Sequence, residues 1–359
     1  MVYSEITEMT DITSALERTA GQREKPLRLV LAGGSGRIGE VLARHFHGQG
    51  DLVTVLSRRV SHAPWRVVGW DGAEPGAWCA ELDGADVLVN LAGRSVDCRY
   101  SARNRREILE SRVGTTQLLG NVIRGLESPP RLWMNMSTAT IYRHAFDREM
   151  DEASGEIGGN ERDTPPSWRF SINVATSWEE AFFAAETPKT RKIALRSAMV
   201  MSPERGGVFA MLLRLVRLGL GGASGSGKQF MSWIHETDFV RAIEYLIAHE
   251  EFAGAVNVAA PGPLPNAEFM QALRQAWGIG FGLPATRWML EIGVVVLRTE
   301  TELILKSRRV IPGRLVESGF RFQFPEWRSA ARDLVERWRN QAKEMPPAVA
   351  GISTKARVR

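Results

Sequence analysis

The chain has 359 residues, of which 44% are hydrophobic and 24% are charged, and its formal net charge is +5. This is the composition of an ordinary globular protein, long enough to bury a large core and to form about two domains. The basic residues are spread over the whole chain without a nucleic-acid-binding module, which argues against a nucleic-acid partner. No segment reaches the roughly 20 apolar residues of a membrane span, so we expect no membrane insertion.

The two cysteines, Cys79 and Cys98, do not have the spacing of a metal site, and we expect no metal centre. Such sparse use of cysteine favours a reduced, cytoplasmic setting. Residues 1–25 are polar and are expected to form a flexible extension. Residues 341–359 contain adjacent prolines and several late basic residues, which predicts a disordered tail.

A glycine-rich turn separates an apolar segment, residues 28–32, from residues 37–47, where apolar side chains recur at helical spacing. Strand, tight turn and helix in this order predict a dinucleotide-binding site rather than a plain glycine-rich turn. The glycines allow a sharp turn, close approach of a pyrophosphate and close packing of helix on strand. The first turn of the helix offers unpaired N–H groups to a phosphate. The residues expected to hold the cofactor here are Gly33, Gly36, Arg37, Ile38 and Gly39.

Further segments of the first half alternate between predicted strands and predicted helices. The segments that predict strands are 51–57, 66–70, 85–91, 131–136 and 192–196, and those that predict helices are 103–126 and 171–186. This alternation predicts an α/β fold with a Rossmann-type, doubly wound parallel sheet, which binds ligands at the carboxyl ends of its strands. We place this domain at residues 26–205. The polar residues 147–168 are expected to form a long loop beside the site, with a lid as one interpretation.

The second half has a different character, and we expect residues 206–340 to form a smaller C-terminal substrate domain. Its predicted helices are 208–218, 238–248, 267–277, 289–305 and 329–338, and its predicted strands are 230–235 and 255–258. His235 lies at the start of one of these helices, where a capping and packing role is favoured over catalysis.

Two further turns bear on the cofactor. Ser57 and Arg58 follow the second predicted strand, where an acidic residue commonly holds the ribose of NAD. An arginine suits the 2′-phosphate of NADP instead, so we predict NADP as the cofactor. Leu91, Ala92 and Gly93 follow the fourth predicted strand, where small residues let the backbone lie against a nicotinamide ribose.

These motifs occur in an order that resembles the extended short-chain dehydrogenase/reductases, the NAD(P)-dependent sugar epimerase and dehydratase group. The three-apart glycines, residues 90–93 and residues 137–142 carry the resemblance. More narrowly, the chain is similar over roughly residues 27–338 to an atypical subgroup usually labelled "epimerase family protein". The segments typical of that subgroup are 217–222, 233–235, 309–312 and 317–320.

The resemblance implies an enzyme in which the cofactor moves a hydride and the protein moves a proton. Thr138 matches the family's Ser/Thr position that binds a substrate oxygen, and Tyr142 matches a tyrosine that lines the site. By the resemblance, these two are the candidate catalytic residues, and the substrate is a small carbonyl compound or a nucleotide sugar.

The family's Tyr-x-x-x-Lys pair is missing from the helix that should carry it. By the family's spacing, its two positions fall on Ser171 and Ala175 or, one residue later, on Ile172 and Thr176. Two functions therefore remain open: an NADP-dependent oxidoreductase or epimerase-like enzyme, and a non-catalytic NADP-binding protein with a redox-sensing or regulatory role.

Overall fold

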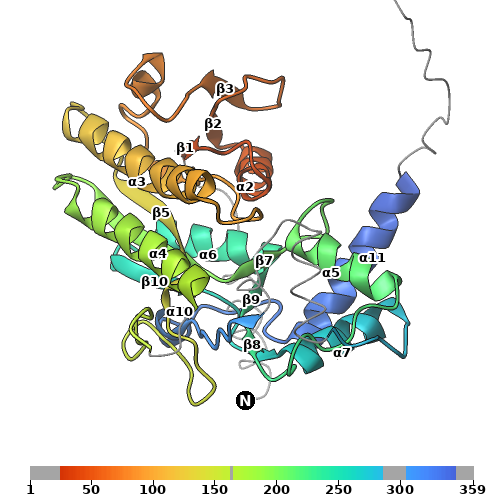
Figure 1. The fold of residues 1–359 in the computed structure, drawn as a ribbon. Helices are drawn as coiled ribbons and strands as arrows, with labels where there is room; N and C mark the ends of the chain where they lie inside the picture. Colours follow the sequence, from red (N-terminus) through yellow and green to blue (C-terminus); the bar gives the residue numbers. More distant parts are fainter. Residues whose placement is uncertain (1–24, 162–164, 286–304, 345–359) are drawn as a thin grey trace, which may run out of the picture.

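The computed structural model describes residues 25–161, 165–285 and 305–344 (Figure 1). Its centre is a seven-stranded sheet in the order β10-β6-β5-β4-β1-β2-β3, and every neighbouring pair is parallel. The strands are β1 (Arg28–Ala32), β2 (Leu52–Ser57), β3 (Arg66–Gly69), β4 (Val87–Asn90), β5 (Leu132–Thr138), β6 (Arg191–Ser197) and β10 (Gly254–Val258). The Rossmann-type α/β fold predicted from the sequence is confirmed.

Helices cover both faces of this sheet, because successive side chains of a strand point to opposite faces. The four long ones are α2 (Arg37–Gly48), α3 (Ala102–Arg124), α4 (Pro166–Ala184) and α6 (Glu236–Ala248). Two short 3-10 helices, η1 (Ala77–Glu81) and η2 (Ala139–Ile141), lie in the connections. Leu29 of β1 packs on the face of α2 and α6, whereas the next residue, Val30, packs on the face of α3 and α4.

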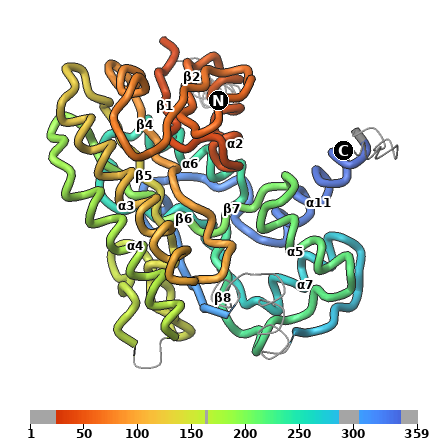
Figure 2. Tube along the Cα trace, turned by 45° about the horizontal axis from the view of Figure 1, so that its top comes forward, coloured from red at the N-terminus to blue at the C-terminus, as the bar shows by residue number. Residues whose placement is uncertain are grey.

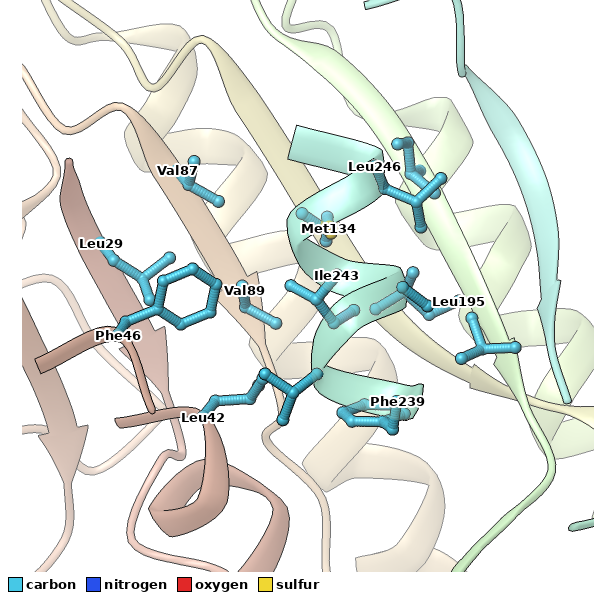
Figure 3. Packing of buried hydrophobic residues seen from close by; sticks show 14 of the residues in the cluster. Leu29, Leu42, Phe46, Val87, Val89, Met134, Leu195, Phe239, Ile243 and Leu246 are labelled. Atoms are coloured by element: carbon cyan, nitrogen blue, oxygen red, sulfur yellow. The ribbon is translucent and has the colours of Figure 1, made fainter. Parts of the chain in front are cut away.

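Figure 3 shows the first of these faces, with Phe46 of α2 and Ile243 of α6 packed over the sheet. On the second face, Leu119 of α3 and Phe182 of α4 pack against Trp133 of β5. Because both faces are covered, β4 is fully buried, as its unbroken apolar sequence predicts.

The second part of the molecule is a helical unit beside the sheet (Figures 1 and 2). Its helices are α5 (Val208–Arg217), α7 (Asn266–Trp277) and α11 (Trp327–Glu344), whereas the short α10 (Gly313–Glu317) packs against β10 of the sheet. Short strands complete it: β7 (Met199–Met201) pairs with β9 (Trp233–His235), and β8 (Phe230–Met231) pairs with β11 (Leu264–Pro265). Trp327 lies at its centre, stacked on Phe269 and edge-on to Trp233.

The sheet continues past residue 205, where the sequence places the end of the nucleotide-binding domain. β10 pairs with β6 along its whole length, and α6 covers the sheet beside α2. The sheet domain therefore also includes residues from beyond 230, because β10 is its edge strand. The predicted helix 289–305 lies almost entirely outside the described residues, as do residues 1–24 and 345–359 of the two predicted flexible ends.

His235 is a helix cap, as predicted. Its Nδ1 accepts the backbone N–H of Thr237 at 3.1 Å, and its Nε2 lies 3.0 Å from the Asp333 carboxylate. The side chain is fully buried, and this burial lowers the pKa of His235 to about 4. His235 therefore joins α6 to α11.

The described part of the predicted loop 147–168 is held in place by the C-terminal segment. Met150 exchanges backbone hydrogen bonds with Arg309 and Ile311, at 2.7 and 3.0 Å. The Glu152 carboxylate accepts the backbone N–H of Asn257 at 2.7 Å. These contacts hold the loop against β10 and residues 309–311. Within the described chain, no helix is long and apolar enough to span a membrane.

Candidate functional site

A cavity of about 390 Å³ lies at the carboxyl ends of β1, β4 and β5, where a doubly wound sheet binds its ligands. The glycine turn and the start of α2 form one wall, and α3 and α4 form the other. Its lining includes most of the site residues expected from the sequence, namely Gly33, Gly36, Arg37, Ile38, Gly39, Leu91, Ala92, Gly93 and Thr138. The structure thus brings together residues from three strand ends.

The glycine turn is shaped for close backbone contacts. A Cβ atom on Gly39 would lie 2.2 Å from the carbonyl oxygen of Gly34, so only glycine lets α2 begin here. Gly33 has φ +73°, and a Cβ there would lie 2.8 Å from Cα of Ala92. Gly36 differs, because a Cβ on it would meet only one atom, 4.0 Å away. The space over Gly36 is therefore open to a ligand.

The start of α2 has no side-chain cap, since its N-cap residue is Gly36. The first N–H groups of a helix have no partner within the helix, and they carry the positive end of its dipole. Together with the guanidinium of Arg37, they give this wall of the cavity a positive potential. The wall has the chemistry of a phosphate-binding site.

Ser57 and Arg58 lie outside the cavity lining, at the end of β2. The buried Ser57 hydroxyl donates to Ser35 Oγ at 2.9 Å, which ties the end of β2 to the glycine turn. Arg58 is exposed, and it forms no ion pair with any residue that the structure describes. Its guanidinium is therefore open to a ligand beside the glycine turn.

Thr138, at the end of β5, has a hydroxyl group with a defined orientation. Its Oγ1 accepts the backbone N–H of Thr140 at 3.1 Å and so caps η2. With the oxygen used as an acceptor, the hydroxyl proton remains for a ligand oxygen. Beside it, the Ser137 hydroxyl donates to Glu179 at 2.6 Å.

Tyr142 lies apart from these residues, contrary to its expected place in the site. Only 1% of it is exposed, and it is absent from the cavity lining. Its hydroxyl donates to Asn257 Oδ1 and accepts from Arg196 Nη1, both at 2.9 Å. Burial raises the pKa of this phenol, although the charge of Arg196 opposes the shift. The reason is tertiary: Arg196 of β6 lies over the ring and Asn257 of β10 bonds the hydroxyl, and both strands lie far along the chain.

The missing Tyr-x-x-x-Lys pair can now be placed. Ser171 and Ala175 on α4 both line the cavity, whereas Ile172 is buried away from it. The register with Ser171 and Ala175 is therefore the one that faces the site. Another tyrosine, Tyr100, lines the cavity beside this position, and its Oη lies 3.2 Å from Ser171 Oγ.

Two cavity residues that the sequence motifs did not single out contact each other between α3 and α4. Arg112 of α3 lies with its guanidinium carbon 5.2 Å from the ring centroid of Trp178 on α4. The Trp178 indole N–H donates to Thr116 Oγ1 at 2.9 Å, and this hydroxyl belongs to a buried polar cluster with Asn90 and Asn135. The available signal for Arg112 was an arginine four residues after Ile108, on the side of α3 that is buried.

Comparison with known proteins agrees with this geometry. Residues 29–259 match the NAD dependent epimerase/dehydratase family, and residues 285–334 match a domain of unknown function (DUF1731). The first match covers more than half of the chain, which therefore belongs to the NAD dependent epimerase/dehydratase family.

Individual relatives extend over most of the chain. It is 33% identical over 315 residues to the epimerase family protein SDR39U1 of Mus musculus, covering 86% of this chain and 100% of that protein. It is 28% identical to the epimerase family protein YfhF of Bacillus subtilis, covering 86% and 98%. The crystal structure of human SDR39U1 (isoform 2) with NADPH has a TM-score of 0.74 at 31% identity, covering 86% and 99%. The subgroup resemblance seen in the sequence is confirmed.

Proposed function

We propose that this protein is an NADP-dependent oxidoreductase or epimerase-like enzyme that acts on a small carbonyl compound or a nucleotide sugar. The observation that carries the proposal is that one cavity is lined both by the glycine turn and by Thr138. One end has the chemistry for a pyrophosphate, and the other has a hydroxyl donor for a substrate oxygen. The similar human SDR39U1, crystallised with NADPH, supports the choice of cofactor.

The residues present fit NADP. The first N–H groups of α2, with the open backbone at Gly36, hold the pyrophosphate. Arg58 binds the 2′-phosphate, and residues 91–93 lie along the nicotinamide ribose. When bound, the cofactor supplies hydride transfer. The cytoplasmic setting expected from the sparse cysteines is part of the same proposal.

Thr138 orients the substrate in this proposal by donating its hydroxyl proton in a hydrogen bond to the reacting oxygen. Tyr142 does not exchange protons with the substrate, because its buried hydroxyl is held between Arg196 and Asn257. It is a positioning residue instead, since it supports Arg196 and, through Glu179, the Ser137 hydroxyl at the cavity wall.

A non-catalytic NADP-binding protein is the second candidate. It is favoured by Ser171 and Ala175, which face the cavity where the family's tyrosine and lysine would lie. The two candidates share the cofactor and differ in turnover. A screen of carbonyl compounds and nucleotide sugars with NADPH, followed at the cofactor absorbance, separates them. Turnover that falls in Thr138→Val and returns in Thr138→Ser supports the enzyme, and activity indifferent to both contradicts the role of Thr138.

Cofactor choice is tested by titrating NADPH and NADH against the intrinsic tryptophan fluorescence. We expect NADPH to bind more tightly, and Arg58→Ala to weaken NADPH about tenfold while leaving NADH within twofold. Arg131→Ala is the matched control, because it removes an exposed positive charge at the amino end of β5. An equal loss for both cofactors in Arg58→Ala contradicts the 2′-phosphate contact, and binding of neither cofactor overturns the proposed function.

A further inference from the structure

Arg112 presents hydrogen-bond donors that the protein itself does not use. A guanidinium carries five N–H groups and no acceptor. In the described part of the chain, the only acceptor bonded to it is the carbonyl oxygen of Ile108, 3.1 Å from Nη1 in the same helix. The remaining donors belong to a side chain that lines the cavity.

The positive charge of Arg112 also lacks a carboxylate partner. None of the residues that line the cavity is acidic. Two other arginines are different: Arg196 forms a double hydrogen bond with Glu179, and Arg94 bonds to Glu107 and Asn104. Burial lowers the pKa of Arg112 to about 10, so the group is still charged at neutral pH. A partly buried cation without an anionic partner is unfavourable unless a ligand supplies the anion.

The surroundings of Arg112 hold its guanidinium in place. One contact is the Trp178 ring, which is itself fixed through Thr116 to the polar cluster of Asn90 and Asn135. The other is the backbone of Gly93, where a Cβ atom would lie 3.1 Å from the guanidinium carbon. The Trp178 ring and the Gly93 backbone together fix the planar guanidinium, which can then form two hydrogen bonds to one carboxylate or phosphate.

The cofactor pyrophosphate has its own site on the opposite side of the sheet end. The start of α2 and Arg37 provide it, and the Arg37 side chain extends toward Gly206, where a Cβ would lie 2.6 Å from its Nη2. Arg112 comes instead from α3, on the other face of the sheet, and lies beyond Gly93. The cavity therefore has two separate cationic ends.

We infer that Arg112 binds a carboxylate or phosphate group of the small-molecule substrate, with Trp178 as its platform and Gly93 as the close backbone neighbour. This inference rests on the proposed function, and it narrows the substrate to anionic compounds. Arg112 thus acts as a specificity-determining residue, which selects an anionic substrate over the neutral compound of the same shape.

The test measures anion binding and cofactor binding separately. Wild type and the variants Arg112→Met, Arg112→Lys and Arg124→Met are titrated with malonate, inorganic phosphate and the uncharged dimethyl malonate by calorimetry, with and without saturating NADPH. Arg124 is the matched control, because it lies at the exposed end of the same helix. NADPH affinity is measured for each variant by fluorescence, and circular dichroism checks that each variant folds.

We expect wild type and Arg124→Met to bind malonate or phosphate saturably in the presence of NADPH, and not to bind the ester. Arg112→Met should weaken the anion at least tenfold and leave NADPH within twofold. Arg112→Lys keeps the charge without the planar guanidinium, so we expect an intermediate loss of anion affinity. This variant also serves as the test if Arg112→Met does not fold.

Three results overturn the inference: no saturable anion binding to wild type, anion binding that is unchanged in both Arg112 variants, or a tenfold loss of NADPH with anions competing for the cofactor site. The last would assign Arg112 to the cofactor. Failure of NADPH to bind wild type is a different result. It overturns the proposed function, while titrations without cofactor still report whether Arg112 binds anions.

Discussion

The two walls of the cavity are built in different ways. At the glycine turn, the decisive contacts are between backbone atoms close in sequence, such as those of Gly34 and Gly39. At the wall of α3 and α4, they are between side chains far apart, such as the indole of Trp178 and the hydroxyl of Thr116, separated by 62 positions. The first wall keeps the family's pattern. The second departs from it, with Ser171 and Ala175 in place of the reactive pair.

The largest effect on stability is expected at the ion pair between Arg196 and Glu179 of α4, in the second wall. Arg196→Met leaves the buried carboxylate of Glu179 without its double hydrogen bond. We expect a loss of about 3–5 kcal/mol in the free energy of unfolding. Urea unfolding measures this, and Arg131→Met, at an exposed pair, should change it by less than about 1 kcal/mol. Similar losses in both variants would contradict a special role of the buried pair.

In the first wall, a single added methyl group at Gly39 should destabilise the glycine turn. Gly39→Ala puts a Cβ atom 2.2 Å from a backbone oxygen that cannot rotate away. Strain of this kind should cost about 2–3 kcal/mol of stability. Gly114→Ala provides the control, because Gly114 lies in α3 with nothing within 4 Å, and this change should stabilise by about 0.5–1 kcal/mol. If the two changes have the same sign, the close approach of the Gly34 carbonyl oxygen to Gly39 does not decide the effect.

Tyr142→Phe tests whether the buried phenol is structural. We expect a cost of about 1–2 kcal/mol, because Arg196 and Asn257 each lose a hydrogen-bond partner, with NADPH affinity unchanged. Tyr245→Phe, which loses a bond to the Ser318 carbonyl, is the matched control. A loss of turnover without any loss of stability would return Tyr142 to the catalytic residues.

The same tyrosine predicts a pH dependence. Burial raises its pKa in the native state, so the unfolded chain releases the phenolic proton at a lower pH than the folded chain. The stability that Tyr142 contributes is therefore present below the ordinary tyrosine pKa of about 10 and is lost as pH rises above it. Unfolding free energies measured from about pH 8 to about pH 11, at intervals of roughly one pH unit, should fall more steeply with rising pH for wild type than for Tyr142→Phe.

The smallest effect on folding is expected at Gly36, where the first wall faces open space. Gly36→Ala should change stability by no more than about 1 kcal/mol. It should nevertheless weaken NADPH about tenfold, since the methyl group occupies the space over the helix start. Equal NADPH affinity in wild type and Gly36→Ala would show that the pyrophosphate does not lie over this residue.

The sequence by itself determined the parallel sheet, the glycine turn and the capping role of His235. These features depend on short-range patterns: an apolar strand followed by spaced glycines and a helix, or a side chain two residues from the N–H that it caps. The family's spacing also identified Thr138, Ser171 and Ala175 as cavity positions, because they follow or lie in regular elements.

Only the tertiary structure decided what surrounds those positions. Tyr142 became a buried positioning residue because its hydroxyl meets Asn257, 115 positions away on a strand that the sequence assigned to the second domain. Arg112 gained its platform because α3 and α4 pack side by side, and the periodicity of neither helix encodes its neighbour. Residue type and spacing set local geometry, whereas the charge and shape of the cavity depend on which distant side chains the fold brings together.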